Sequence, residues 1–208
     1  MPTPRRALIV IDVQNEYFSG RLRIEYPAPA LSLANIGRAM DGARQAGIPV
    51  IVIQHTAPAG VPVFQRDTHN WALHTEIAAR PRDHHFEKHW PSAFTGTDLA
   101  AWLAERYIDT LSVVGYMTQN CVDSTIKEAM HRGLAAECLI DATGTLPYAN
   151  SAGRVSAETV QHTQAVIFQS NFAAVLSTDE WLSAVADQRA VAPDNVLMSY
   201  ERAQSTAA

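Results

Sequence analysis

The sequence predicts an α/β fold of three layers, doubly wound, in which a six-stranded, mostly parallel sheet carries helices on both faces. Apolar runs of strand length recur along the 208 residues and alternate with amphipathic stretches of helical length, which is the pattern of such a sheet. Most of these runs are rich in Val and Ile, as is typical of strands buried on both faces. A hydrophobic content of 47% is sufficient for one full core.

Each apolar run is interpreted as one strand of the sheet, bounded by polar or turn-forming residues. In chain order, the six predicted strands are Ala7 to Val13, Pro49 to Gln54, His85 to Lys88, Thr110 to Gly115, Ala135 to Asp141 and Ala165 to Gln169.

Helices are predicted between the strands from apolar stripes at helical spacing. One stripe runs from Leu33 to Ala43 and is followed by Gly47, a residue free to adopt the positive φ that stops a helix. Two further stripes span 99–103 and 122–130, and Ser177 with Glu180 predicts a capping box that opens a last helix. No linker divides the chain, so we expect a single domain over 1–192 and a loosely ordered tail over 193–208.

Charge and cysteine content narrow the classes of partner and compartment. The net charge of -5 and the absence of any Lys/Arg run favour a small-molecule substrate over nucleic acid or a membrane surface. The first apolar run, Ala7 to Ile11, is too short for a signal peptide or membrane span. Cys121 and Cys138 form no short-spaced pair, so we expect neither a disulfide framework nor a thiolate zinc site, and a cytoplasmic location.

Polar residues at the ends of apolar runs are the first candidates for a site, because ligands of such sheets bind beyond the carboxyl ends of the strands. Asp12 interrupts the first run, where a buried carboxylate is costly unless a cation compensates it. Lys88 ends the third run and needs a counter-ion in turn. The two side chains could satisfy each other.

Cys121 lies at the start of the helix predicted from Val122. A helix N-terminus and a nearby Lys both favour an anion, so we expect a lowered thiol pKa and a thiolate nucleophile. Backbone N–H groups from Met117 to Cys121 could hold the oxyanion of a tetrahedral intermediate. Cys138 lies within an apolar run and is interpreted as an inert core residue.

Three motifs together resemble those of the isochorismatase-like cysteine hydrolases, which include nicotinamidases and N-carbamoylsarcosine amidases. Asp12 stands in LIVIDVQN, Lys88 in EKHWPSAFTGTDL and Cys121 in VVGYMTQNCV. The resemblance implies that Asp12 is the base, Lys88 its charge partner and Cys121 the nucleophile that cleaves a small amide, ureido or carbamoyl C–N bond through a thioester. It further implies an oxyanion hole from the backbone of Met117 and Cys121, and no cofactor.

The resemblance also implies a non-proline cis peptide between Tyr116 and Met117 and a homodimer or homotetramer. Nicotinamidases carry an Asp-x-His metal motif after the second strand, whereas this chain has Ile53, Gln54 and His55 there, so no metal is predicted. Substrate contacts are assigned from position alone, although Trp90 and Phe94 could equally be core residues. The assigned residues are Gln14, Phe18, His55, Trp90, Phe94, Tyr116 and Gln119.

Three alternatives stay open. An isochorismatase-type ether hydrolase does not need the cysteine, and a non-catalytic relative would only bind a small molecule. A nucleotide-binding or receiver-like module also places an Asp after its first strand, but no glycine-rich phosphate loop follows Asp12.

Overall fold

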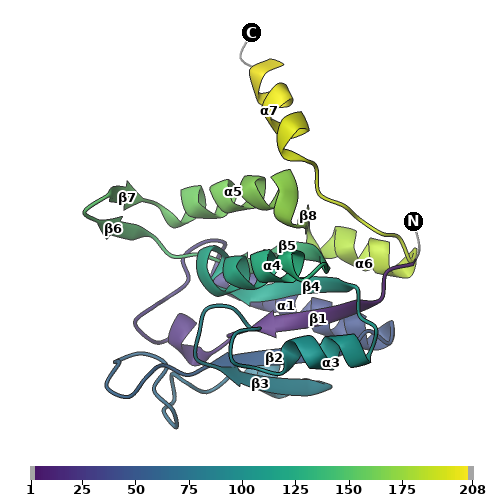
Figure 1. The fold of residues 1–208 in the computed structure, drawn as a ribbon. Helices are drawn as coiled ribbons and strands as arrows, with labels where there is room; N and C mark the ends of the chain where they lie inside the picture. Colours follow the sequence, from purple (N-terminus) through teal and green to yellow (C-terminus); the bar gives the residue numbers. More distant parts are fainter. Residues whose placement is uncertain (1–2, 206–208) are drawn as a thin grey trace.

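The computed structural model describes residues 3–205. Its central sheet has six strands in the order β3-β2-β1-β4-β5-β8, and every neighbouring pair is parallel. Helices cover both faces of the sheet (Figure 1), so the predicted α/β class is confirmed. The strands are β1 (Arg6–Ile11), β2 (Val50–His55), β3 (His84–Lys88), β4 (Thr110–Tyr116), β5 (Ala135–Gly144) and β8 (Ala174–Leu176).

Two hydrophobic cores lie on opposite faces of the sheet because successive residues of a strand point to opposite sides. Leu8 and Val10 of β1 pack in one core with α1 (Pro29–Gln45) and α6 (Thr178–Ala186). Ile9 and Ile11 pack in the other core with α3 (Leu99–Glu105) and α4 (Asp123–His131). Strand β1 is therefore buried on both faces, as its continuous apolar sequence predicts.

Shorter elements and the C-terminal helices complete the described chain. They are η1 (Asn15–Tyr17), α2 (Thr75–Ala78), the π-helical turns η2 (Thr118–Val122) and η3 (Phe168–Phe172), the hairpin β6 (Tyr148–Asn150) with β7 (Gly153–Val155), α5 (Ala157–Ile167) and α7 (Val196–Ser205). Within residues 3–205, no helix is both long and apolar enough to cross a membrane.

One strand predicted for the C-terminal part of the chain is wrong. The apolar run Ala165 to Gln169 is not a strand but the end of α5 and the start of η3, and the sixth strand is β8. Ser156 caps α5 by accepting a hydrogen bond from the Thr159 amide, which commits the run that follows to a helix. Of the tail predicted over 193–208, residues 206–208 lie outside the described residues, and the described part contains α7, which projects away from the body of the domain (Figure 1).

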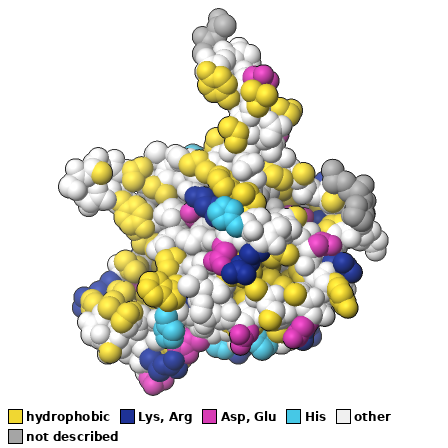
Figure 2. All heavy atoms as spheres, in the orientation of Figure 1, with side chains coloured by type: hydrophobic (Ala, Val, Ile, Leu, Met, Phe, Trp, Pro, Cys, Tyr) yellow, Lys and Arg dark blue, Asp and Glu magenta, His cyan; other side chains and the backbone are white. Residues whose placement is uncertain are grey.

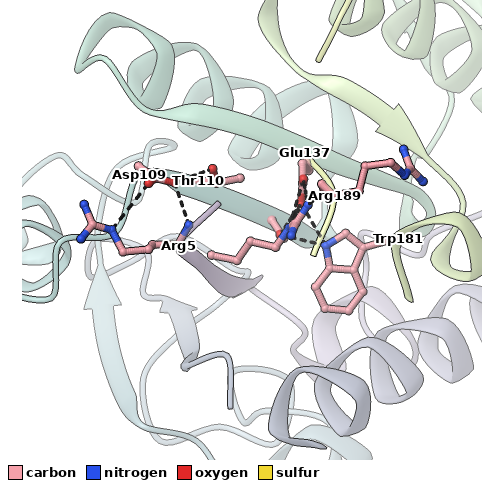
Figure 3. A network of polar contacts seen from close by, with 8 residues as sticks. Arg5, Asp109, Thr110, Glu137, Trp181 and Arg189 are labelled. Carbon is pink, nitrogen blue, oxygen red and sulfur yellow. Dashed lines mark hydrogen bonds and ion pairs between the residues drawn. The ribbon is translucent and has the colours of Figure 1, made fainter. Parts of the chain in front are cut away.

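A buried polar network holds the amino-terminal end of the sheet, opposite the site described below (Figure 3). Glu137 of β5 forms an ion pair of 2.7 Å with Arg6 of β1 and accepts hydrogen bonds from Ser112 and Trp181. Glu137 and Arg6 are 1% and 5% exposed, so each charge depends on the other for compensation.

Strands β1 and β4 approach closely at Gly115, one residue before the end of β4. Its φ is +108°, and a Cβ atom added there would lie 2.1 Å from the carbonyl oxygen of Ile11. Only glycine fits this backbone conformation and this contact. The carboxyl ends of the two central strands are thereby brought together, immediately before Asp12 and the turn that carries Cys121.

Candidate active site

The three residues singled out in the sequence meet at the carboxyl end of the sheet. Asp12 directly follows β1, Lys88 ends β3, and Cys121 lies in η2, the turn between β4 and α4. The Nζ atom of Lys88 is 2.7 Å from Oδ2 of Asp12 and 3.2 Å from Sγ of Cys121. Asp12, Lys88 and Cys121 are only 0%, 1% and 5% exposed, so these contacts form away from bulk solvent.

Asp12 is positioned by a sharp turn rather than by the strand itself. Its φ is +52°, in the left-handed region that Asp tolerates better than most residues, and its amide donates to the carbonyl of Ile53 in β2. The side chain predicted to be embedded in a strand therefore stands just beyond the strand end. The backbone is held on both sides of the residue, because the carbonyl of Asp12 accepts a hydrogen bond from Gln14.

Lys88 uses its ammonium group to connect the other two residues. Besides its ion pair with Asp12 and its hydrogen bond to Cys121, it donates to the carbonyl oxygen of Trp90 at 3.0 Å, so the ammonium group has three neighbours that favour its charge. Burial lowers the pKa of Lys88, but the negative charges of Asp12 and Cys121 raise it, and the net pKa is above the usual value. Lys88 is therefore a permanent cation in the site.

The expected lowering of the thiol pKa is wrong. Burial, followed by the charge of Asp12, raises the pKa of Cys121 to about 12, although Lys88 acts in the opposite direction. The helix dipole and the lysine do not outweigh the loss of water around the sulfur together with a neighbouring carboxylate. The resting site consequently contains a neutral thiol beside an Asp–Lys ion pair.

Local hydrogen bonds fix the turn that carries Cys121. The hydroxyl of Thr125 donates to the carbonyl of Cys121 at 2.7 Å and accepts from the amide of Ala93 at 3.0 Å, which ties η2 to the loop after β3. The expected cis peptide between Tyr116 and Met117 is present. Thr125 was not predicted, because only the fold brings the loop after β3 to this helix.

Three residues assigned to the substrate are buried and already bond to or pack against the rest of the chain. Gln14 is fully buried, and its amide bonds to backbone groups of His55 and Trp71. Tyr116 is 0% exposed and shares a 2.8 Å hydrogen bond with Ser32. Phe94 belongs to the core on the α3 and α4 face. Their polar groups are already satisfied, or their rings already packed, so they have little left to offer a ligand.

The other assigned residues are His55, Gln119, Phe18 and Trp90. Buried polar atoms without a hydrogen-bond partner in the described chain include Nδ1 of His55 and Oε1 of Gln119. Burial, with a contribution from Lys88, lowers the pKa of His55 although Asp12 opposes the shift, so its ring is neutral at pH 7. Phe18 packs edge-on against Tyr116, and Trp90 is 61% exposed.

Three further residues near the site were not predicted. Tyr17 of η1 is buried, and burial, followed by the charges of Cys121 and Asp12, raises its pKa well above the usual value. Thr118 has a buried hydroxyl that finds no partner among residues 3–205. Tyr148, on the β6–β7 hairpin, hydrogen-bonds Gln119 at 3.0 Å. Tyr17 and Thr118 adjoin predicted site segments, whereas the hairpin gave no recognisable sequence signal.

Metal binding has a simple geometric requirement, namely several ligating side chains that converge on one point. Among residues 3–205, no group of three or more His, Cys, Asp or Glu side chains is arranged to hold a metal ion.

Comparison with known proteins identifies the family. The family model of the isochorismatase domain matches residues 6–180. A crystallised protein of Burkholderia xenovorans LB400 assigned as an isochorismatase is 57% identical over 99% of both chains, with a TM-score of 0.97. The isochorismatase family protein YddQ of Bacillus subtilis is 29% identical over 85% of this chain and 98% of its own. The ureidoacrylate amidohydrolase of Methylobacterium radiotolerans is 31% identical over 65% of this chain and 66% of its own. The chain therefore belongs to the isochorismatase family of hydrolases.

Proposed function

We propose that the chain is a cysteine-dependent amidohydrolase that cleaves an amide, ureido or carbamoyl C–N bond of a small molecule through a thioester. The observation that carries the proposal is the contact of one buried ammonium group with both a carboxylate and a thiol, at 2.7 Å and 3.2 Å. An ether hydrolase would have no use for the sulfur at this position. The amidohydrolase among the relatives supports the same chemistry.

The first half of the reaction forms the thioester. Asp12 takes the proton of the Cys121 thiol as the sulfur attacks the substrate carbonyl, and the proton then passes to the departing nitrogen. The backbone N–H groups of Met117 and Cys121 stabilise the oxyanion. Ammonia or an amine leaves, and the acyl group remains on sulfur.

The second half releases the acid. Asp12 takes a proton from water, the resulting hydroxide attacks the thioester, and the sulfur leaves and recovers its proton. Lys88 stays charged throughout the reaction. It contacts both Asp12 and Cys121, so it stabilises the negative charge on either of them. Both halves of the reaction involve proton transfer and no redox step. Every proton moves between Asp12, Cys121, water and the departing nitrogen.

The unpartnered polar atoms around the site suggest how an amide is held. Oε1 of Gln119 is a hydrogen-bond acceptor, and Nδ1 of neutral His55 accepts or donates according to its tautomer, which suits a substrate with an amide group. An uncharged substrate also fits the site, because the opposite charges of Asp12 and Lys88 cancel each other. A nucleophile that must stay a free thiol is consistent with a reducing cytoplasm, which we include in the proposal.

Ammonia release from a panel of primary amides, ureides and carbamoyl compounds tests the proposal. Cys121→Ala should abolish release by the best substrate, and Cys138→Ala should retain it, because Cys138 is fully buried in the sheet. Intact-protein mass spectrometry of the quenched reaction should find the acyl group on the wild-type chain and not on Cys121→Ala. Turnover that survives in Cys121→Ala would refute the proposal.

A further inference from the structure

Helix α7 presents its apolar side away from its own domain. None of its ten residues, all of them described, is buried. Val196, Leu197 and Tyr200 form one stripe by their i, i+1 and i+4 spacing, and they are 63%, 64% and 61% exposed. On another side of the helix, Ser199 and Arg202 line a hollow of about 500 Å³ between α7 and the end of α5, which Val166 also lines.

This orientation is the reverse of an ordinary surface helix, whose apolar stripe faces its own core. A ten-residue helix is also too short to be stable in water without tertiary contacts, since isolated helices below about 12–15 residues are marginal. The contacts that hold this segment include polar ones: the amide of Asp194 donates to Gln169, and Arg202 pairs with Asp194. A second surface that covers the stripe would supply the tertiary contacts that such a short helix needs.

A matching apolar surface lies at the base of the arm formed by α7. Val166 and Ile167, at the end of α5, are 69% and 38% exposed, and Figure 2 shows hydrophobic side chains both on the arm and along the face below it. Each chain thus carries an exposed apolar arm and an exposed apolar floor. A pair related by a two-fold axis can use both at once, because each arm then lies on the floor of the other chain.

We propose that α7 docks on the α5 face of a second copy of this chain in a reciprocal exchange of arms. The chemistry of the arm favours a protein partner: it holds one Glu and one Arg, so it has no net charge to attract nucleic acid or an anionic membrane. The crystallised Burkholderia relative aligns over 99% of both chains, which includes the arm, so the arm belongs to the shared fold. The exchange would bury two apolar stripes and two apolar floors, one of each from either chain.

Cross-linking between two different single variants tests the exchange directly. Tyr200→Cys and Val166→Cys proteins are mixed and treated with a short bis-maleimide, and peptides that join residues 200 and 166 are sought by mass spectrometry. Such a link can only connect two copies, and the natural cysteines are 5% and 0% exposed. The matched control mixes Tyr200→Cys with Leu31→Cys, which is 54% exposed on α1. We expect the 200–166 link and no 200–31 link.

Sedimentation equilibrium of the full chain provides the second measurement. Tyr200→Glu and Val166→Glu should each raise the dimer dissociation constant by about tenfold or more, as truncation of an interface anchor does, while Leu31→Glu should leave it unchanged. All three positions are exposed in the isolated chain, so the substitutions should preserve the fold, which circular dichroism verifies. A chain that stays monomeric at every concentration, or a dimer that none of these substitutions weakens, would overturn the proposal.

Discussion

The Asp12–Lys88 pair makes a quantitative prediction, because both side chains are 0% exposed and their charged atoms are 2.7 Å apart. At an effective dielectric constant of 20, two unit charges at that distance attract by about 6 kcal/mol. Much of this attraction only offsets the cost of removing the charges from water. Removing one partner leaves the other charge buried and unpaired, which typically costs about 3–5 kcal/mol.

We therefore expect Lys88→Met and Asp12→Asn each to lower the free energy of unfolding by about 3–5 kcal/mol, and the double variant to lose far less than their sum. Asn is the replacement of choice at position 12, because it tolerates the positive φ of +52° as Asp does. Urea unfolding at pH 7 and fixed protein concentration, followed by tryptophan fluorescence and circular dichroism, gives the four free energies.

The chain contains a matched control. Lys127 and Asp123 of α4 also form an ion pair of 2.7 Å, but their side chains are 37% and 18% exposed. A cycle with Lys127→Met and Asp123→Asn should give a coupling below about 1 kcal/mol, because solvent screens exposed pairs. The reasoning fails if the coupling of the buried pair is no larger than that of the exposed pair.

Three further predictions concern packing, the opposite end of the sheet and the thiol. Gly115→Ala should lower the free energy of unfolding by about 4 kcal/mol or more, because its Cβ would overlap Ile11. Gly47→Ala is the control: its φ is +69° but its Cβ would lie in open space, so it should lower the free energy of unfolding by about 1–2 kcal/mol. Urea unfolding measures both changes. Glu137→Gln should lower the free energy of unfolding by about 3–5 kcal/mol through the unpaired Arg6, with kcat retained in the ammonia assay because the two residues lie at the far end of the sheet. The rate of iodoacetamide alkylation of Cys121 should rise about tenfold per pH unit from pH 7 to 10, since its pKa is raised to about 12 and only the thiolate reacts; a plateau near pH 8 would contradict this.

The strands that could be predicted are those whose apolar runs are bounded on both sides by polar or turn residues. The runs that became β1, β2 and β4 agree with the structure to within one or two residues. The run over 165–169 failed because its four apolar residues fit the end of a helix as well as a strand. Its capping residue, Ser156, decides the matter nine residues earlier, and the true strand β8 is only three residues long.

The residues of the site likewise fall into those that could be predicted from the sequence and those that could not. Asp12 and Lys88 could be located because an ionisable side chain within or at the end of an apolar run needs a partner of opposite charge. Cys121 could be located because it stands at the start of a predicted helix, and all three residues lie in the motifs of the resemblance. Gln14 follows β1 and Tyr116 ends β4, yet their polar groups bond to the backbone of His55 and to Ser32, which lie far away in sequence. Position along a strand predicts where a side chain lies but not whether its hydrogen bonds are already used.

The raised pKa of Cys121 and its proposed role as a nucleophile are compatible once the whole charge of the site is considered. With a neutral thiol, the site holds Asp12 as an anion and Lys88 as a cation. Transfer of the thiol proton to Asp12 moves the negative charge to sulfur but leaves the sum unchanged. The ammonium group already lies 2.7 Å from one oxygen and 3.2 Å from the sulfur, so it can accompany the charge without moving. A prearranged cation of this kind stabilises the thiolate when substrate arrives, at no cost in reorganisation.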